Sequence, residues 1–384
     1  MVKKILIVLP SFLNGGTNTC LRSLLPVLKD HKFDVDVFAI TNVGPNREYA
    51  AKYANILGVG GDAIEVRSKP TFRQRVAFIV KSIKKALCKV GIDISPVVFK
   101  KVASQLERNN YDLIISYQEG ITTHFCSYFT HTPMIAWVHC DYEMYLKAAQ
   151  KKPEIKRYSK FKKVVCVSEF TKGQFTKFVN SCSNVYALHN ITDDKLINER
   201  AQISIVDPLY EFAGIKIVSV GRINEVKRFS EIPRIISELK ANGLKEFRWY
   251  LIGDGDEEEK EKLLANQKKY EAKELILLGN KDNPYPYIKS ADLFVVTSST
   301  EACPCVVAEA QILHTPIVAT DFSSVFEFIK NRETGIISNI DNISDSIVEY
   351  FTDANLQSSI IRNVENFTFE NESIINKLTN EILL

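Results

Sequence analysis

Apolar residues along the chain form short continuous runs that alternate with longer amphipathic stretches. In the first half, the apolar runs are KKILIVL, DVDVFAI, DLIISY, MIAWVH and KVVCVS. In the second half, they are KIVSVG, RWYLIG, ELILLG, DLFVVTS and PIVATD. Stretches with a helical period lie between these runs, for example residues 17–30, 229–243 and 257–270. Strand-like and helical segments that alternate this often predict an α/β fold, with parallel sheets covered by helices on both faces.

The series of strands restarts at Ile217 and has a glycine turn of its own, which predicts two doubly wound domains within the 384 residues. Turn-forming residues at 189–194 follow the last apolar run of the first half and mark the boundary. We therefore expect one Rossmann-like domain at 1–190 and a second at 191–366. Residues 367–384 are expected to form a helix that crosses back to the first domain. Ligands of such sheets bind beyond the carboxyl ends of the strands.

The composition is that of a globular protein, with 45% hydrophobic and 25% charged residues. No apolar run reaches the length of a membrane span. The N-terminal run MVKKILIVLP is short, ends in proline and lacks a small-residue cleavage site, so we interpret it as a strand rather than a signal peptide. None of the eight cysteines forms a C-x-x-C pair, and most lie in apolar runs. We expect reduced thiols in a cytoplasmic protein.

Charge is divided unevenly between the two halves. Residues 1–190 hold 28 Lys and Arg against 14 Asp and Glu, a net charge of +14, whereas residues 191–384 hold 21 against 32, a net charge of −11. Ten of the basic residues lie within 67–101, where they interleave with apolar residues around one acid, Asp93. This pattern is typical of a helix on an anionic membrane surface and equally of a solvated helix face. Nucleic acid is not an expected partner, because no recognised motif accompanies the charge.

The stretch EACPCVVAEA places Glu301 and Glu309 around a short apolar segment. A metal site, a pair of catalytic carboxylates and two acceptors for one polar ligand are the three interpretations. Pro304 fits the first turn of a helix, so that the free N–H groups of Cys305, Val306 and Val307 can meet an anion. The preceding strand ends where a doubly wound sheet binds its ligand. Carboxylates that accept from hydroxyls, beside amides that donate to phosphate, indicate a nucleotide-sugar site. A helix cap with a solvated glutamate is the alternative.

Other polar or flexible residues also follow predicted strands. Arg222 and Lys227 lie just past the first strand of the second half, where they can hold a diphosphate and neutralise a leaving group. A solvated basic loop is the alternative. Gly15 and Gly16 follow the first strand of the chain and allow the backbone to approach a ligand. His139 also follows a strand; a lone histidine is more often structural, but this position favours function.

The Asp-x-Asp of residues 254–259 is similar to a metal-binding motif. It follows a strand and begins an acidic helix, an arrangement that the helix dipole favours without any metal. We expect Gly253 and Gly255 to form a tight turn beside the nucleotide, and we expect no metal site.

Four segments of the second half occur in a characteristic order: VGRINEVKRF, LIGDGDEEE, LLGNKDNPYPYIKSADLFVVTSSTEACPCVVAEA and TPIVATDFSSVFEFIKNRETGII. Together they resemble the retaining GT-B glycosyltransferases with a Glu-x7-Glu motif, and they are most similar to bacterial capsule and exopolysaccharide transferases. The resemblance is dense over residues of about 215–340. It is thinner in the first half, where FLNGGTNTC and WVHCDY carry it. It implies two Rossmann-like domains that face each other across a cleft, the first for the acceptor and the second for the donor.

By this resemblance, Arg222 and Lys227 hold the donor diphosphate, Glu309 binds the ribose hydroxyls, Glu301 faces the donor sugar and His139 lies near the anomeric carbon. Catalytic roles follow for His139, Glu301, Arg222 and Lys227. The residues expected around the donor, besides Arg222, Lys227 and Glu309, are Gly15, Gly16, Gly253, Asn280, Cys303, Pro304, Cys305 and Val306.

The chain departs from the family pattern at two places. Ala302, Cys303 and Pro304 replace the commoner Gly-Phe-Gly or Gly-Phe-Pro, and Ser323 and Ser324 stand where Gly-Gly is frequent. These residues line the pocket of the donor sugar in the family, so the resemblance leaves the identity of the sugar open.

The expected function is retaining transfer of a hexose or N-acetylhexosamine from a nucleotide sugar, expected to be a UDP-sugar, to a growing lipid-linked glycan in surface polysaccharide synthesis. No metal cofactor is expected. The enzyme would be cytoplasmic and peripheral on the inner face of the membrane, with residues 67–101 as its contact. Two alternatives stay open: a nucleotide-sugar 2-epimerase of the same architecture, and a non-catalytic subunit that binds the nucleotide sugar.

Overall fold

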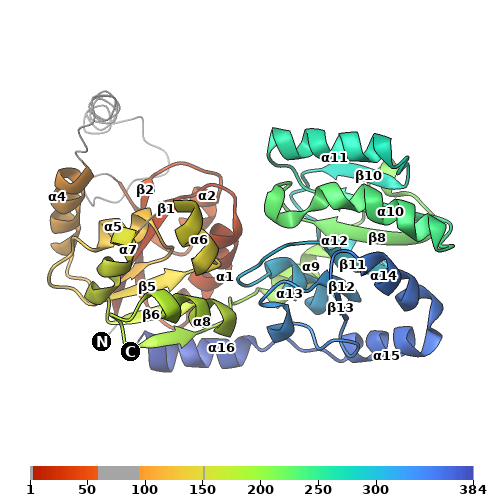
Figure 1. Ribbon diagram of the computed structural model, residues 1–384. Helices are drawn as coiled ribbons and strands as arrows, with labels where there is room; N and C mark the ends of the chain where they lie inside the picture. The colour runs from red at the N-terminus through yellow and green to blue at the C-terminus, as the bar shows by residue number, and fades with distance from the viewer. Residues whose placement is uncertain (1–2, 59–94, 150–151, 384) are drawn as a thin grey trace. The chain divides into compact units, whose positions relative to one another are not determined.

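The computed structural model describes residues 3–58, 95–149 and 152–383 (Figure 1). The chain divides into two compact units. Unit 1 comprises Met1–Ile191 and Glu372–Leu384, and unit 2 comprises Thr192–Asn371. The largest part of the basic segment predicted at 67–101 lies outside the described residues, and its last residues belong to helix α4.

Unit 1 contains a seven-stranded parallel sheet with the order β3-β2-β1-β4-β5-β6-β7. Its strands are β1 (Lys4–Ser11), β2 (Asp34–Thr41), β3 (Asn55–Leu57), β4 (Leu113–Ser116), β5 (Met134–Val138), β6 (Lys163–Cys166) and β7 (Val185–Ala187). Its helices are α1 (Gly16–Asp30), α2 (Asn46–Ala50), α4 (Ser95–Glu107), α5 (Ile121–Cys126), α6 (Tyr142–Ala149), α7 (Lys152–Arg157), α8 (Glu169–Phe178) and α16 (Asn371–Lys377).

Unit 2 contains a six-stranded parallel sheet with the order β10-β9-β8-β11-β12-β13. Its strands are β8 (Ile215–Val220), β9 (Phe247–Ile252), β10 (Leu275–Gly279), β11 (Leu293–Val296), β12 (Ile317–Thr320) and β13 (Ile336–Ser338). Its helices are α9 (Asp194–Arg200), α10 (Ile232–Ala241), α11 (Glu257–Lys269), α12 (Tyr285–Lys289), α13 (Cys305–Ile312), α14 (Ile343–Thr352) and α15 (Ala354–Glu365).

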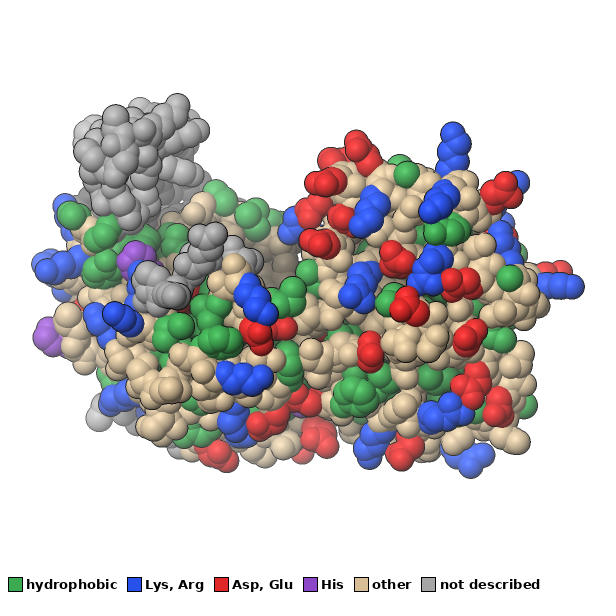
Figure 2. All heavy atoms as spheres, in the orientation of Figure 1, with side chains coloured by type: hydrophobic (Ala, Val, Ile, Leu, Met, Phe, Trp, Pro, Cys, Tyr) green, Lys and Arg blue, Asp and Glu red, His purple; other side chains and the backbone are tan. Residues whose placement is uncertain are grey.

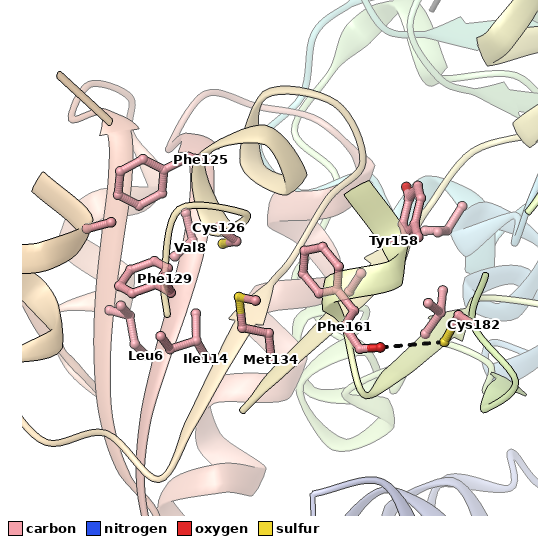
Figure 3. Close-up of a cluster of buried hydrophobic side chains, with 14 of the residues drawn as sticks. Leu6, Val8, Ile114, Phe125, Cys126, Phe129, Met134, Tyr158, Phe161 and Cys182 are labelled. Atoms are coloured by element: carbon pink, nitrogen blue, oxygen red, sulfur yellow. Dashed lines mark hydrogen bonds between the residues drawn. The ribbon is translucent and has the colours of Figure 1, made fainter. Parts of the chain in front are cut away.

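Each sheet is buried on both faces, as the continuous apolar runs predict. Trp249 and Tyr250 are neighbours on β9 and enter different hydrophobic clusters, the first with residues of α10, α11 and α14 and the second with residues of α9, α12 and α13. Figure 3 shows one cluster of unit 1, in which the Cys182 thiol donates to the Phe161 carbonyl across 3.7 Å. The seven cysteines of the described residues are free thiols.

The two sheets share a topology that creates a binding edge. In unit 1 the strand order reverses between β1 and β4, and in unit 2 it reverses between β8 and β11. The loops that follow the two central strands of each sheet leave in opposite directions at this point, so a crevice forms at the carboxyl edge. Predicted functional residues follow β1, β8 and β11 at these edges, and His139 follows β5, which pairs with β4.

The end of the chain packs on unit 1. Lys377 of α16 donates to the Ala187 carbonyl at 3.0 Å, and Lys163 of β6 donates to the carbonyls of Glu381 and Ile382 at 2.6 and 3.0 Å. The two bonds from Lys163 satisfy carbonyls at the C-terminus of the last helical turn, which lack partners within the helix. The terminal residues thereby form part of unit 1.

Candidate functional site

The first part of the site lies at the β8/β11 edge of unit 2. Lys227 follows β8, Glu301 follows β11, and the Lys227 Nζ to Glu301 Oε1 distance is 2.5 Å. Their side chains are 18% and 16% exposed, so the pair is screened from water only in part. Ser298 donates its hydroxyl to the same Glu301 oxygen at 2.7 Å. The structure thus brings together two of the residues that the sequence predicts as catalytic.

Hydrogen bonds between the two loops hold Lys227 in position. The Lys227 N–H donates to Asn224 Oδ1 at 3.0 Å, and the Lys227 carbonyl accepts from Thr297 Oγ1 at 2.6 Å. The Ser299 N–H donates to the Val226 carbonyl at 2.8 Å. Because the loop after β8 is tied to the loop after β11, the Lys227 ammonium and the Glu301 carboxylate belong to one rigid edge.

Arg222 lies apart from this pair. Its guanidinium binds Asp256 at 2.6 Å, and the two side chains are 68% and 49% exposed. An ion pair so open to water contributes little free energy, so a bound anion can compete for Arg222 at small cost. Figure 2 shows acidic side chains gathered over α11, whose first turn holds Glu257, Glu258 and Glu259.

Helix α13 begins one residue later than the sequence predicts. Pro304 is the N-cap, with φ −75° and ψ 96°, and Cys305 is the first helical residue. The Val307 N–H donates to the Pro304 carbonyl at 3.0 Å, so the prediction of a free N–H at Val307 is wrong. The reason is that the extended Pro304 turns its carbonyl toward the first turn. Cys305 and Val306 provide the N–H groups that an anion at this helix end would meet.

Glu309 is the buried carboxyl group of α13, with 8% exposure. Burial raises its pKa to about 7, and the positive charge of Lys227, a hydrogen bond from Tyr285 and the positive charge of Arg200 oppose the rise. Glu309 is therefore near enough to Lys227 to sense its charge, although it lies on α13 and Lys227 lies in the loop after β8. Tyr285 and Arg200 were not predicted as site residues; the aromatic at the start of α12 gives no local signal of this contact.

The predicted glycine turn after β9 packs backbone against backbone. Gly253 has φ +148°, and a Cβ there would lie 1.8 Å from the Gly221 carbonyl oxygen. A Cβ at Gly255 would lie 1.9 Å from the carbonyl oxygen of Ile223. Both glycines are required because this turn supports the loop that carries Arg222. Asn280, which follows β10, is exposed.

Two serines donate hydrogen bonds to Glu301. Ser324, which departs from the glycine that is frequent in the resembled family, is fully buried and donates its hydroxyl to the Glu301 carbonyl at 2.7 Å. Cys303 and Cys305 are half-buried, and the Cys305 thiol lies 3.9 Å from the Cys303 carbonyl oxygen. Sequence reasoning noted Ser324 only as a departure and missed Ser298, although its place three residues before Glu301 would allow this contact.

Three predicted residues lie in unit 1. Gly15 caps α1, and a Cβ on Gly15 or Gly16 would meet no atom within 4 Å, so the packing of the described residues does not itself demand glycine there. His139 directly follows β5, and its ring lies edge-on to Tyr117 with 4.9 Å between centroids. Burial lowers the pKa of His139 to about 3, so the imidazole is neutral at ordinary pH.

Unit 2 is similar to a known protein family. Residues 213–367 match the model of the family "Glycosyl transferases group 1". Unit 2 is a group 1 glycosyltransferase domain. The match covers β8 through α15 and hence Arg222, Lys227, Glu301 and Glu309.

Two curated proteins that are similar to this chain come from bacteria. The amylovoran biosynthesis glycosyltransferase AmsD of Erwinia amylovora is 28% identical over 177 residues, which are 45% of this chain and 47% of that protein. An N-acetylgalactosaminyltransferase of Campylobacter jejuni, which acts on N-acetylgalactosamine-N,N'-diacetylbacillosaminyl-diphospho-undecaprenol, is 28% identical over 40% of each chain. The matched region thus spans less than half the length of these relatives.

Solved structures resemble the whole chain. Anabaena HepE, in complex with UDP and glucose, has a TM-score of 0.73 at 15% identity and covers 98% of each chain. The TarM protein of S. aureus has a TM-score of 0.70 at 14% identity and covers 99% of each chain. At this identity the likeness shows the fold, and the chain has the GT-B fold of two Rossmann-like domains.

Two features are absent from the described residues. None of their helices combines the length and the apolarity that a membrane crossing requires. No group of three or more His, Cys, Asp or Glu side chains in these residues is arranged to hold a metal ion.

Proposed function

We propose that this chain is a retaining glycosyltransferase that moves a hexose or N-acetylhexosamine from a UDP-sugar to a lipid-linked glycan in bacterial surface polysaccharide synthesis. The observation that carries the proposal is the meeting of Lys227, Glu301 and Glu309 at the β8/β11 edge of the group 1 glycosyltransferase domain. The names of the Erwinia and Campylobacter relatives support the pathway, and the UDP bound to Anabaena HepE supports the nucleotide.

Each group of this edge has a role in donor binding. Lys227 would neutralise the diphosphate, with Arg222 released from Asp256 as a second cation, and the N–H groups of Cys305 and Val306 would donate to phosphate oxygens. The carboxylates of Glu301 and Glu309 would accept from hydroxyls of the sugar and the ribose. Two cations beside the diphosphate can supply the charge neutralisation that a metal supplies elsewhere, so we propose that no metal is required.

Retention of the anomeric configuration would follow if the acceptor attacks the anomeric carbon on the face that the leaving group occupies. The bond between the anomeric carbon and the phosphate oxygen breaks, and the acceptor oxygen bonds to that carbon on the same face. The acceptor proton passes to the departing phosphate oxygen, and Lys227 stabilises the charge that develops on the diphosphate. His139, neutral by virtue of its burial, would bind a hydroxyl near the reacting carbon.

The test is a screen of UDP-, GDP- and dTDP-sugars by thermal shift, followed by product analysis. A donor at one hundred times its Kd should add about 2.7 kcal/mol of stability. Transfer to a polyprenyl-diphosphate sugar should give a glycoside with the donor's anomeric configuration by NMR, with and without EDTA. An isomeric nucleotide sugar formed without acceptor would identify an epimerase. Binding without any turnover would identify a non-catalytic subunit, and inversion or full loss of activity in EDTA would contradict the mechanism.

The pH dependence of nucleotide binding should report the protonation state of Glu309. Hydroxyls that donate to its carboxylate favour the charged form, so binding lowers a pKa that starts at about 7 and releases a proton. The Kd for UDP should therefore fall as pH rises from 6 to 8, by about tenfold, and then level off. Calorimetry at several pH values would measure this fall. The Glu309→Gln variant, in which only the nucleotide titrates, should show a flatter profile; equal slopes would disprove the role.

Membrane attachment is proposed from the sequence of residues 67–101, most of which lie outside the described residues. An anionic surface would attract these ten basic residues, and salt would weaken the attachment. Sedimentation with liposomes that contain anionic lipid should carry down the parent protein at low salt. A variant with glutamine at Arg73, Arg75, Lys81, Lys84 and Lys85 should remain in solution. Equal binding of both proteins would exclude this segment as the contact.

A further inference from the structure

A buried carboxylate that has no role in the proposed donor site lies at the carboxyl edge of unit 1. Glu119 is in the turn between β4 and α5 and is 8% exposed. Its Oε2 accepts the backbone N–H of His139, which follows the neighbouring strand β5, at 2.9 Å. Its own backbone N–H and the thiol of Cys140 donate to the same carboxylate. Glu119 thus connects the ends of two adjacent strands.

Three hydrogen-bond donors surround the Glu119 carboxylate, and the nearby charge of Glu154 is negative and therefore repels it. Burial raises the pKa of Glu119, and the negative charge of the nearby Glu154 adds to the rise, while the three donors oppose it. Burial and the charge of Glu119 also raise the pKa of the Cys140 thiol, so it stays a donor. An ionised carboxylate only accepts hydrogen bonds, whereas a glutamine would turn an NH₂ group toward one of the donors. The three donors therefore suit a glutamate better than its neutral isostere.

The turn that carries Glu119 is itself rigid. Gly120 has φ +86°, and a Cβ there would lie 2.8 Å from the Tyr145 hydroxyl oxygen. The Gly120 N–H donates to Glu154 Oε1 of α7 at 2.7 Å, and Ser116 donates to the Gln118 carbonyl at 3.1 Å. Because the turn is anchored to β4 and α7, the carboxylate of Glu119 can hold the backbone after β5 in one direction.

The residue that Glu119 holds has an unused polar atom. His139 Nε2 is buried and has no hydrogen-bond partner among the described residues. Its ring is kept against Tyr117. A buried polar atom without a partner costs free energy unless a ligand or water pairs with it. The direction of His139 Nε2 affects function only if a ligand binds beside this nitrogen.

We propose that Glu119 is a positioning residue for His139: through the backbone of residues 139 and 140 it aims His139 Nε2 at a hydroxyl group of the sugar acceptor. This rests on the proposed function for the identity of the ligand. Glu119 itself need not touch the substrate.

The test combines an NMR signal with steady-state kinetics. The chain has six histidines, and His139→Gln identifies the Cε1–H signal of His139. Glu119→Ala should shift and broaden that signal while the other five stay in place. The kcat of glycosyl transfer should fall about 10- to 100-fold, because small misplacements of a reacting group have effects of this size. The KM for the nucleotide sugar should stay within about twofold, since the groups proposed to bind the diphosphate and the ribose lie in unit 2.

Two variants make the test specific. Glu107 is the matched control, because its carboxylate accepts the N–H groups of Thr130, His131 and Thr132 just before β5, as Glu119 accepts that of His139 just after it. Glu107→Ala should leave kcat and the His139 signal unchanged. Glu119→Gln keeps an oxygen for the His139 N–H and should restore the signal and most of kcat. If the alanine variant does not fold, a Glu119→Gln protein with a shifted His139 signal and the parent kcat would overturn the positioning role.

The outcomes separate this inference from the proposed function. An unchanged His139 signal in Glu119→Ala overturns the positioning role, whether or not the parent protein transfers sugar. A shifted signal with an unchanged kcat also overturns it, since the aim of His139 would then be irrelevant to turnover. If the parent protein shows no transfer with any donor, the proposed function fails, and the NMR arm still decides whether Glu119 orients His139.

Discussion

Replacement of Lys227 by alanine is expected to lower the kcat of glycosyl transfer by about 10²- to 10³-fold, the usual effect of removing one group that stabilises a developing negative charge. Lys227 is the cation that the structure holds beside Glu301 and within electrostatic reach of Glu309. It lies on a loop whose position is set by bonds to Asn224 and Thr297. A cation in a fixed position acts on the diphosphate without reorganisation, which is why its loss should affect kcat more than KM.

The matched control for Lys227 is Lys240. Lys240 pairs with Glu274 at 3.1 Å, in the same unit, but Glu274 precedes β10 and so lies at the amino edge of the sheet. Lys240→Ala removes an ion-paired lysine away from the donor and should retain the parent kcat. Because Lys227→Ala also leaves Glu301 without its cation, unfolding should be followed in parallel by the fluorescence of Trp249. Turnover of a folded Lys227→Ala protein at the parent rate would show that Lys227 does not stabilise the leaving group.

Replacement of Glu154 by alanine is expected to destabilise unit 1 by about 3–5 kcal/mol, because buried hydrogen-bond donors would lose their acceptor. Glu154 is fully buried. It accepts from the Gly120 N–H at 2.7 Å, Thr123 Oγ1 at 3.0 Å, Tyr145 Oη at 2.5 Å and Tyr158 Oη at 3.3 Å. Alanine would leave these four donors buried without that acceptor, and each such group costs about 1–3 kcal/mol.

The measurement needs a probe of unit 1 alone, because two domains do not unfold as one two-state system. The chain has two tryptophans, Trp137 in β5 and Trp249 in β9. A Trp249→Phe background therefore reports urea unfolding of unit 1 through Trp137. Glu169→Ala, which removes a side chain 65% exposed, is the control and should unfold with the background protein. A Glu154→Ala midpoint equal to that of the control would mean that water or rearrangement satisfies the four donors.

The strands with long apolar runs could be predicted directly from the sequence, whereas three short strands could not. The predicted strands correspond to β1, β2, β4, β5, β6 and to β8 through β12. β3, β7 and β13 were missed because each has three residues and lies at the edge of its sheet. Three residues at a sheet edge carry too little alternation or apolarity to differ from a loop. Their place is decided by pairing with β2, β6 and β12.

The candidate site could likewise be predicted from the sequence only in part. The strand-end positions of Arg222, Lys227, Glu301 and His139 follow from the sequence, because the carboxyl ends of parallel strands form one edge. Which partners meet there does not follow, since the contacts join loops far apart in the chain. Sequence reasoning grouped Arg222 with Lys227, but the structure pairs Arg222 with Asp256 and Lys227 with Glu301.

The sequence by itself determined the α/β class, the two doubly wound units and the strand ends that carry polar residues, because hydrophobic periodicity and glycine or proline positions are local properties of the chain. Only the tertiary structure decided which carboxylates are buried and what they bind. Glu119 and Glu154 gave no local signal, yet both are buried acceptors of backbone and hydroxyl donors. Burial and hydrogen bonding depend on residues that the fold brings together from distant segments, and these set the pKa of Glu309 and the direction of His139.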